Sequence, residues 1–129
     1  MRTVTDHKLN GLNDALNITV LDEPGQGGAN HHYRIEGHAL DLNPSCGLNP
    51  VRPGDIIFQN GPIQEAGVNG LSGEALLAIV IDRLRSFQAG QYACRENACA
   101  LTHLETSLMW LQKRTRDRMA RGVEGTNAK

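Results

Sequence analysis

The spacing of hydrophobic residues changes near residue 72 of this 129-residue chain. Before that point the apolar runs are short, and clusters of Gly, Pro and Asn separate them. Short apolar runs divided by turn residues are typical of antiparallel strands. A short helix near Asp6–Leu16, interrupted by Gly11, precedes the first run. The predicted strands are Ile18–Leu21, Tyr33–Ile35, Ala39–Leu42 and Ile56–Phe58.

After residue 72 the spacing becomes helical. Ser72 suits the N-cap of a first helix, and Glu74 suits the first turn, where the helix dipole favours an acid. Gly90 ends this helix. Apolar residues that repeat at intervals of four and three predict one packed face. On the first helix these residues are Leu76, Val80, Leu84 and Phe87.

A second helix is predicted from about Cys94 to Arg121, and Gly122 stops it. Its apolar stripe consists of Leu101, Leu104, Leu108 and Leu111. Two helices joined by a short turn form an antiparallel hairpin. We therefore expect an α+β fold in which an N-terminal antiparallel β-sheet packs on a C-terminal antiparallel two-helix hairpin. The chain is predicted to be one domain over residues 1–129, with a strand-rich part (1–71), the hairpin (72–122) and a loose tail (123–129).

The second helix is longer than the first. At 1.5 Å per residue the first spans ~24 Å and the second ~42 Å, so the end of the second helix overhangs its partner. In the overhang, Arg114 and Arg118 continue the leucine stripe. An arginine pair at i and i+4 can hold a diphosphate by forked hydrogen bonds. The alternative is a basic helix end that complements the dipole, which suffices for Lys113, Arg116 and Arg121.

Phe87 and Asn97 are predicted at the opposite end of the hairpin from the arginine pair. Residue 114 lies ~25 Å further along the second helix than Asn97. In an antiparallel dimer of hairpins, however, the turn of one chain would meet the overhang of the other. A ring for a base, an amide for a base edge and two guanidinium groups for phosphates would then form a shared nucleotide pocket. For Phe87 and Trp110, the alternative role is a core or subunit-interface anchor.

Charge and composition exclude several classes of function. The net charge is −1 and the sequence pI is about 6.5, so no global positive field attracts duplex nucleic acid or an anionic membrane. The N-terminus lacks the pattern of a signal peptide, and no apolar run reaches the length of a membrane span. Three cysteines without a secretory signal indicate reduced thiols in a cytoplasm.

No familiar catalytic or metal motif stands in the sequence. His31, His32 and His38 lack a Cys or Asp at ligand spacing, so we expect surface or loop histidines and no metal. The C-x-x-C string that zinc nucleotide deaminases require does not occur. The glycines at 25–28 are not followed by Lys-Ser or Lys-Thr, so they do not form a P-loop. Neither catalytic residues nor a cofactor are therefore expected.

Sequence strings that resemble small phage and prophage proteins lie at Phe58–Gly70, Glu74–Leu77, Ile81–Leu84, Ala93–Ala98, Trp110–Leu111, Arg114–Thr115 and Gly122–Thr126. The resemblance covers about residues 57–126 and is to the helical hairpin shared by the Thoeris anti-defence sponges of the first type and the anti-CBASS sponges of the second type. The strand-rich part before it resembles the Thoeris branch, because the anti-CBASS branch is shorter and all-helical.

The resemblance implies a non-catalytic sponge that sequesters host immune signals in the cytoplasm of the infected or lysogenic bacterium. It implies a hexamer built as a trimer of dimers. The implied ligands are glycocyclic ADP-ribose, made by host TIR enzymes, and cyclic trinucleotides at a separate site. The glycocyclic ADP-ribose residues would be Phe87, Asn97, Arg114 and Arg118, with Arg34 from the strand-rich part. The trinucleotide residues would be Arg121, Gly122, Gly125 and Thr126.

Two other functions remain open from the sequence. One is an enzyme that degrades such a cyclic nucleotide, which the absence of a recognisable base or metal set disfavours. The other is an oligomeric nucleic-acid-binding module that uses the basic helix end, which the nearly neutral charge disfavours.

Overall fold

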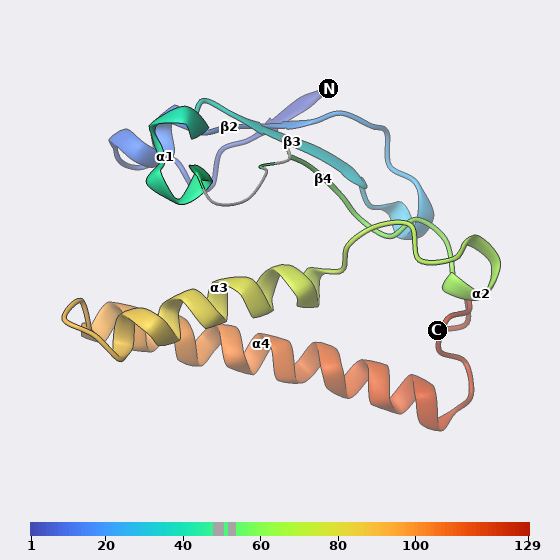
Figure 1. The fold of residues 1–129 in the computed structure, drawn as a ribbon. Helices are drawn as coiled ribbons and strands as arrows, with labels where there is room; N and C mark the ends of the chain where they lie inside the picture. The colour runs from blue at the N-terminus through green and yellow to red at the C-terminus, as the bar shows by residue number, and fades with distance from the viewer. Residues whose placement is uncertain (48–50, 52–53) are drawn as a thin grey trace. The chain divides into compact units, whose positions relative to one another are not determined.

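The computed structural model describes residues 1–47, 51 and 54–129. The chain forms two compact units, residues 1–60 and residues 61–129. The first contains an antiparallel β-sheet and the second a helical hairpin (Figure 1), so the predicted α+β class is confirmed. The division of the chain into domains stays a prediction.

The sheet of the first unit has the strand order β1-β2-β3-β4, and every neighbouring pair is antiparallel. Three of the four predicted strands are confirmed. β1 was not predicted, since its three residues carry too short a pattern to be recognised. The strands are β1 (Arg2–Val4), β2 (Asn17–Val20), β3 (His32–Glu36) and β4 (Asp55–Ile57).

The predicted strand at Ala39–Leu42 is wrong. Leu40–Leu42 forms the 3₁₀ helix η2, in which the amides of Leu42 and Asn43 donate to the carbonyls of Ala39 and Leu40. These backbone groups are therefore satisfied locally, without a neighbouring strand. Two further 3₁₀ helices are η1 (Gln26–Gly28) and η3 (Pro44–Gly47).

Strand register gives the sheet one apolar and one polar face. Ile18 pairs with Ile35, and Tyr33 pairs with Ile56, so these side chains share a face. Phe58 adds its ring edge-on to Tyr33, with centroids 5.7 Å apart. The intervening residues Thr19, Arg34 and Asp55 pair across the opposite face. The alternation in the sequence therefore places Arg34 away from the apolar face.

Gly11 begins a helix rather than interrupting one. Helix α1 runs from Gly11 to Ala15, and the side chain of Asn10 caps it by accepting from the amide of Asn13 at 2.9 Å. Asparagine is a strong N-cap, and it starts the helix after the point that the apolar pattern indicated. Gly37, at φ 100°, passes the end of this helix so closely that a Cβ would lie 1.8 Å from the carbonyl oxygen of Ala15.

In the second unit, the predicted helices are confirmed to within two residues of their bounds. After the short α2 (Ile63–Ala66), helix α3 runs from Gly73 to Gln88 with Ser72 as N-cap. Helix α4 runs from Arg95 to Ala120, and Gly122 follows its C-cap with φ 72°. The lengths of 16 and 26 residues correspond to ~24 and ~39 Å, so α4 extends beyond α3 (Figure 1).

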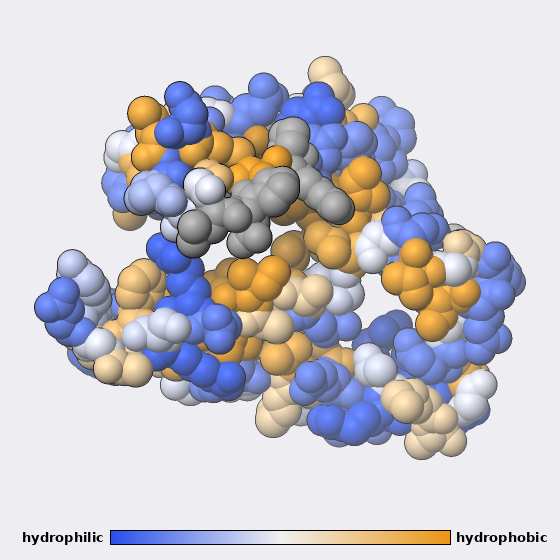
Figure 2. All heavy atoms as spheres, in the orientation of Figure 1, coloured by the Kyte–Doolittle hydropathy of each residue, from blue (hydrophilic) through white to orange (hydrophobic). Residues whose placement is uncertain are grey.

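The packed face of α3 is rotated relative to the prediction. Ile81 is 2% exposed, whereas Val80, which was expected on this face, is 45% exposed. Leu101, Leu104 and Leu108 on α4 are half-buried as expected. An ion pair at 2.7 Å joins Arg85 of α3 to Glu105 of α4. On the visible side of the hairpin, hydrophobic residues lie among hydrophilic ones (Figure 2).

Among the residues that the structure describes, no helix is both long enough and apolar enough to cross a membrane.

Candidate functional site

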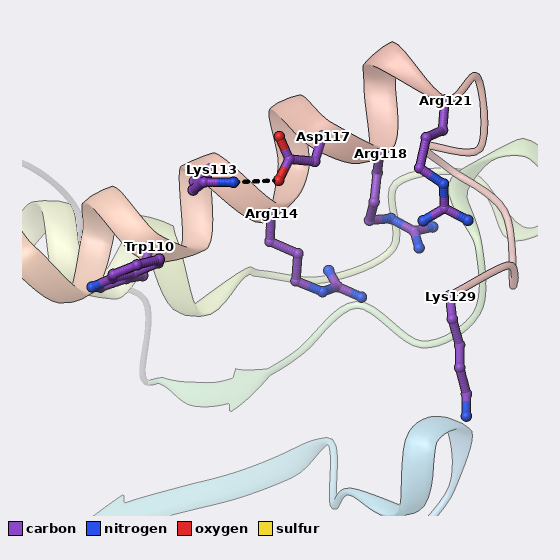
Figure 3. A pocket seen from close by; sticks show the side chains of 7 residues that line it. All are labelled: Trp110, Lys113, Arg114, Asp117, Arg118, Arg121 and Lys129. Carbon is purple, nitrogen blue, oxygen red and sulfur yellow. Dashed lines mark hydrogen bonds and ion pairs between the residues drawn. The ribbon is translucent and has the colours of Figure 1, made fainter.

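The overhanging end of α4 borders a hollow of about 350 Å³. Four of its residues lie on one helical stripe, at intervals of four, four and three, and extend from the same side of the helix (Figure 3). Along α4, the half-buried leucines are thus followed by one tryptophan and three arginines. The lining residues are Trp110, Lys113, Arg114, Asp117, Arg118, Arg121 and Lys129.

The hollow has a surplus of positive charge. Lys113 donates to Asp117 at 2.7 Å within α4 (Figure 3), so this pair contributes no net charge. Arg118 is likewise paired with Glu124, at 3.0 Å. Within the described part of the chain, no carboxylate lies within 4.0 Å of the other lining cations, which are Arg114, Arg121 and Lys129. This set can attract and hold an anion such as a phosphate.

Arg118 is buried and bound by its own chain. Its residue exposure is 7%. Nε donates to the carboxylate of Glu124 at 3.0 Å, and Nη2 donates to the carbonyls of Val123 and Thr126 at 3.0 and 3.1 Å. Nη1 donates to the carbonyl of Ala128. A guanidinium has five N–H groups, so these four bonds leave one. We call this arrangement of Arg118 with residues 123–128 the C-terminal clasp.

Helix α2 forms the other side of the clasp. The amide of Gln64 donates to the carbonyl of Gly125 at 3.2 Å, and its side-chain nitrogen donates to the carbonyl of Glu124 at 3.1 Å. Gly125 has φ 80°, and a Cβ there would lie 2.9 Å from Cγ1 of Ile63. Thr126 closes the turn through its hydroxyl, which donates to the carbonyl of Val123.

The predicted loose tail is therefore wrong for residues 123–128. The segment is held because the buried guanidinium needs acceptors and its carbonyls need donors. Two of the four residues expected to bind cyclic trinucleotides, Gly125 and Thr126, lie in this segment, and the other two, Gly122 and the α4 C-cap Arg121, come directly before it.

Phe87 and Asn97 lie at the other end of the hairpin. The guanidinium of Arg83 stacks over the Phe87 ring at 4.9 Å, and Tyr92 meets that ring edge-on with centroids 6.5 Å apart. Asn97 lies in the first turn of α4, where its backbone N–H donates to Sγ of the N-cap Cys94 at 3.4 Å. Along α4, ~25 Å separates Asn97 from Arg114. Within one chain, Arg114, Arg118 and Arg121 line the same hollow, and neither Phe87 nor Asn97 lies beside them.

Arg34, the candidate from the strand-rich part, lies on the polar face of the sheet. Its Nε and Nη2 donate to the two carboxylate oxygens of Asp55, both at 2.8 Å. The ring of His32 lies 2.7 Å from the same carboxylate. The Arg34 guanidinium and then the His32 ring lower the pKa of Asp55 well below its usual value of 3.8.

Acid is expected to weaken this unit through Asp55. Because its folded-state pKa is depressed, Asp55 contributes stability in full above pH 3.8 and loses it as the pH falls below that value. Asp55→Asn should remove this acid-dependent part and also lower stability at neutral pH, since Arg34 loses its partner. Urea unfolding at a series of pH values measures the effect, with the exposed Asp41→Asn as control. Parallel curves for Asp55→Asn and the native protein would contradict this account.

Two expectations about the histidines have different outcomes. His38 is exposed, and His31, although only 8% exposed, lies in the loop before β3, so both fit the expectation of surface or loop histidines, whereas His32 lies half-buried in β3. The amides of His31 and His32 donate to Asp22 at 2.9 and 3.2 Å. Desolvation raises the pKa of Asp22, but the hydrogen bonds from the backbone amides of His31, His32 and Asp22 itself, together with the charge of His31, lower it overall. Over the described residues, no three His, Cys, Asp or Glu side chains gather as a metal site.

Sequence reasoning missed the partners of the basic stripe. Glu124 was not singled out, although an acid six residues after Arg118 and just beyond the helix is a signal for a clasp. Arg83 was also missed, although it precedes Phe87 by four residues, a spacing that favours a contact between the two. Tyr92, 68% exposed beside Phe87, carried no signal apart from being aromatic.

Comparison with known proteins matches the hairpin region. The family model described as "Acb2/Tad1, hairpin domain" matches residues 52–116. The chain is 57% identical over 74 residues to "Thoeris anti-defense 1" of Bacillus phage SBSphiJ7, which covers 57% of this chain and 52% of that relative. The match thus spans about half the length of the relative. Phe87, Asn97 and Arg114 lie inside the family region, while Arg118 and the clasped loop lie beyond it.

Proposed function

This chain belongs to the Acb2/Tad1 hairpin-domain family, and from this premise we propose that it is a phage anti-defence protein that captures host immune signalling nucleotides without cleaving them. The observation that carries the proposal is the hollow at the end of α4. There, Arg114, Arg121 and Lys129 face a common space without ion-pair partners among the described residues. A surplus of guanidinium groups suits a ligand with several phosphate oxygens.

The proposed main ligand is glycocyclic ADP-ribose. Arg114 would hold its diphosphate by a forked pair of hydrogen bonds, because its guanidinium is exposed and has no carboxylate partner. Arg118 would add a single contact through the one N–H group that the clasp leaves. A role for Arg34 in capture stays a prediction, since Asp55 already holds two of its N–H groups.

Phe87 and Asn97 would come from a second copy of the chain. The ~25 Å between Asn97 and Arg114 is too long for one nucleotide to bridge within one hairpin. In an antiparallel pair of hairpins, the overhang of each α4 would reach the turn of the other chain, and two-fold symmetry would give two pockets. We propose that such dimers assemble further into a hexamer. Support comes from exposed apolar side chains on both helices, among them Ile79, Val80, Leu111 and Met119.

The proposed second ligand is a cyclic trinucleotide at the clasped loop. Arg121 is a cation at the start of this loop, and Gly122 and Gly125 have φ 72° and 80°. At Gly122, where nothing lies within 4 Å of the position of a Cβ, the missing side chain leaves room for a phosphate to approach the backbone amides. Thr126 lies in the same turn. This site would share the end of α4 with the first ligand but use residues after the helix.

Capture without cleavage is tested by recovering the ligand. The purified protein is incubated with glycocyclic ADP-ribose, separated from free ligand and heat-denatured, and the released compound is identified by mass. We expect intact ligand in stoichiometric amount, with light scattering giving the mass of a hexamer. Release of a hydrolysed product would instead indicate an enzyme. Retention of neither form, together with salt-sensitive binding of an oligonucleotide, would favour a nucleic-acid-binding module.

A further inference from the structure

Trp110 is the one tryptophan in the sequence, and its position gives the hollow an aromatic wall. It lies on the stripe of Arg114 and Arg118, one helical turn before Arg114 (Figure 3). The side chain is 61% exposed. Contact of a large apolar side chain with water is unfavourable, so a partner that covers the indole would gain binding free energy.

The surroundings of Trp110 differ from those of a subunit-interface anchor. The residues at i−4, i−3, i+3 and i+4, which flank it on the helix surface, are Thr106, Ser107, Lys113 and Arg114, and all are polar. An interface core is apolar and depleted of charge. The indole is therefore expected to contact a ligand with a flat ring and, because Lys113 and Arg114 lie beside it, a nearby negative charge.

The two aromatic positions of the hairpin also differ in what already contacts them. Phe87 has Arg83 over its ring and Tyr92 at its edge. Among the described residues, neither a ring nor a cation lies against the indole of Trp110. The indole thus has surface available for a flat partner.

We propose that Trp110 is a ligand-binding residue whose indole stacks on the base of the captured nucleotide. The other side chains of the hollow are charged, so the indole is its single aromatic surface. Arg114, ~6 Å away along the stripe, would hold the phosphates. In the shared pocket, the base would lie between this indole and Phe87 of a second copy. The assignment rests on the proposed function and adds to it the group that recognises the base.

Because Trp110 is the one tryptophan of the chain, fluorescence excited in the indole band reports on this side chain alone. We expect glycocyclic ADP-ribose to quench the emission, with saturation at the same ligand concentration as in calorimetry. Inorganic pyrophosphate, which offers phosphates without a base, should bind at the arginines without comparable quenching. Calorimetric binding of the nucleotide with unchanged emission would overturn the role of Trp110 and leave the proposed function standing. Absence of calorimetric binding would overturn both.

Two substitutions test the same assignment by affinity. Trp110→Ala should weaken capture about 10-fold to 100-fold, since stacking of a base on an aromatic side chain contributes that much, whereas Trp110→Phe keeps a ring and should lose only a few-fold. Met109→Ala is the matched control, because Met109 is also exposed, at 50%, but does not line the hollow. Wild-type affinity in Trp110→Ala would overturn the assignment. Where Trp110→Ala also lowers the assembly mass, the quenching of the native protein decides.

Discussion

Replacement of Arg114 by alanine is expected to abolish tight capture of glycocyclic ADP-ribose while leaving the fold intact. The Arg114 side chain is exposed, lines the hollow and forms no ion pair with the described residues, so the folded chain loses little by its removal. The ligand loses a charge-assisted, forked contact to its diphosphate, which is worth ~2–3 kcal/mol. This corresponds to about a 100-fold loss of affinity, measured by calorimetry.

Arg116→Ala is the matched control for this change. Arg116 is the same residue type on the same helix and is exposed, but it does not line the hollow. Both variants remove one positive charge, so a general electrostatic effect would weaken them equally. Equal affinities for the two variants would show that the phosphate is bound elsewhere.

Arg118→Ala is expected to have the largest effect on stability of the changes considered. Its side chain is 8% exposed, and removal leaves the carbonyls of Thr126 and Ala128 without their donor, while the carbonyl of Val123 keeps only its bonds from Thr126. Breaking a buried ion pair on one side typically costs ~3–5 kcal/mol. Since Glu124 is 40% exposed and can be hydrated after the loss, we expect the lower end, ~3 kcal/mol. Chemical denaturation measures the loss, and amide exchange should accelerate at residues 123–128.

Three comparisons make the clasp prediction specific. Arg118→Lys keeps the charge but cannot reproduce four directed hydrogen bonds, so its stability should be intermediate. Glu124→Gln removes one charged partner and leaves the carbonyl acceptors in place, so it should cost less than Arg118→Ala. Arg116→Ala should change stability little. Slow amide exchange at residues 123–128 in Arg118→Ala would refute the clasp.

The two arginines are therefore expected to differ in kind, although both were predicted from the same stripe. A capture defect in Arg114→Ala reports on the ligand contact itself. A defect in Arg118→Ala combines loss of its remaining N–H contact with release of the loop. Amide exchange separates the two, because Arg114→Ala should leave residues 123–128 protected.

The sequence by itself determined the features that depend on neighbouring residues. The side chains of Ser72 and Cys94 cap α3 and α4 by accepting from the backbone amides three residues later in the chain. Gly122 adopts the positive φ that ends α4. The short apolar runs between clusters of turn residues predicted β2, β3 and β4 for the same reason, since a turn also depends on residues that are adjacent in the chain. The lengths of the two helices then predicted the overhang and the separation of Phe87 from Arg114.

The tertiary structure decided the features that depend on distant partners. Periodicity could not choose between Val80 and Ile81 as the residue facing α4, because neighbouring positions differ by a rotation that only the packing of the second helix selects. Arg118 followed the stripe in sequence, but its partners are carbonyls of a loop that returns to it after Gly122. Whether a guanidinium binds a ligand or its own chain depends on which acceptors the fold places within hydrogen-bond distance, and residue spacing does not contain that information.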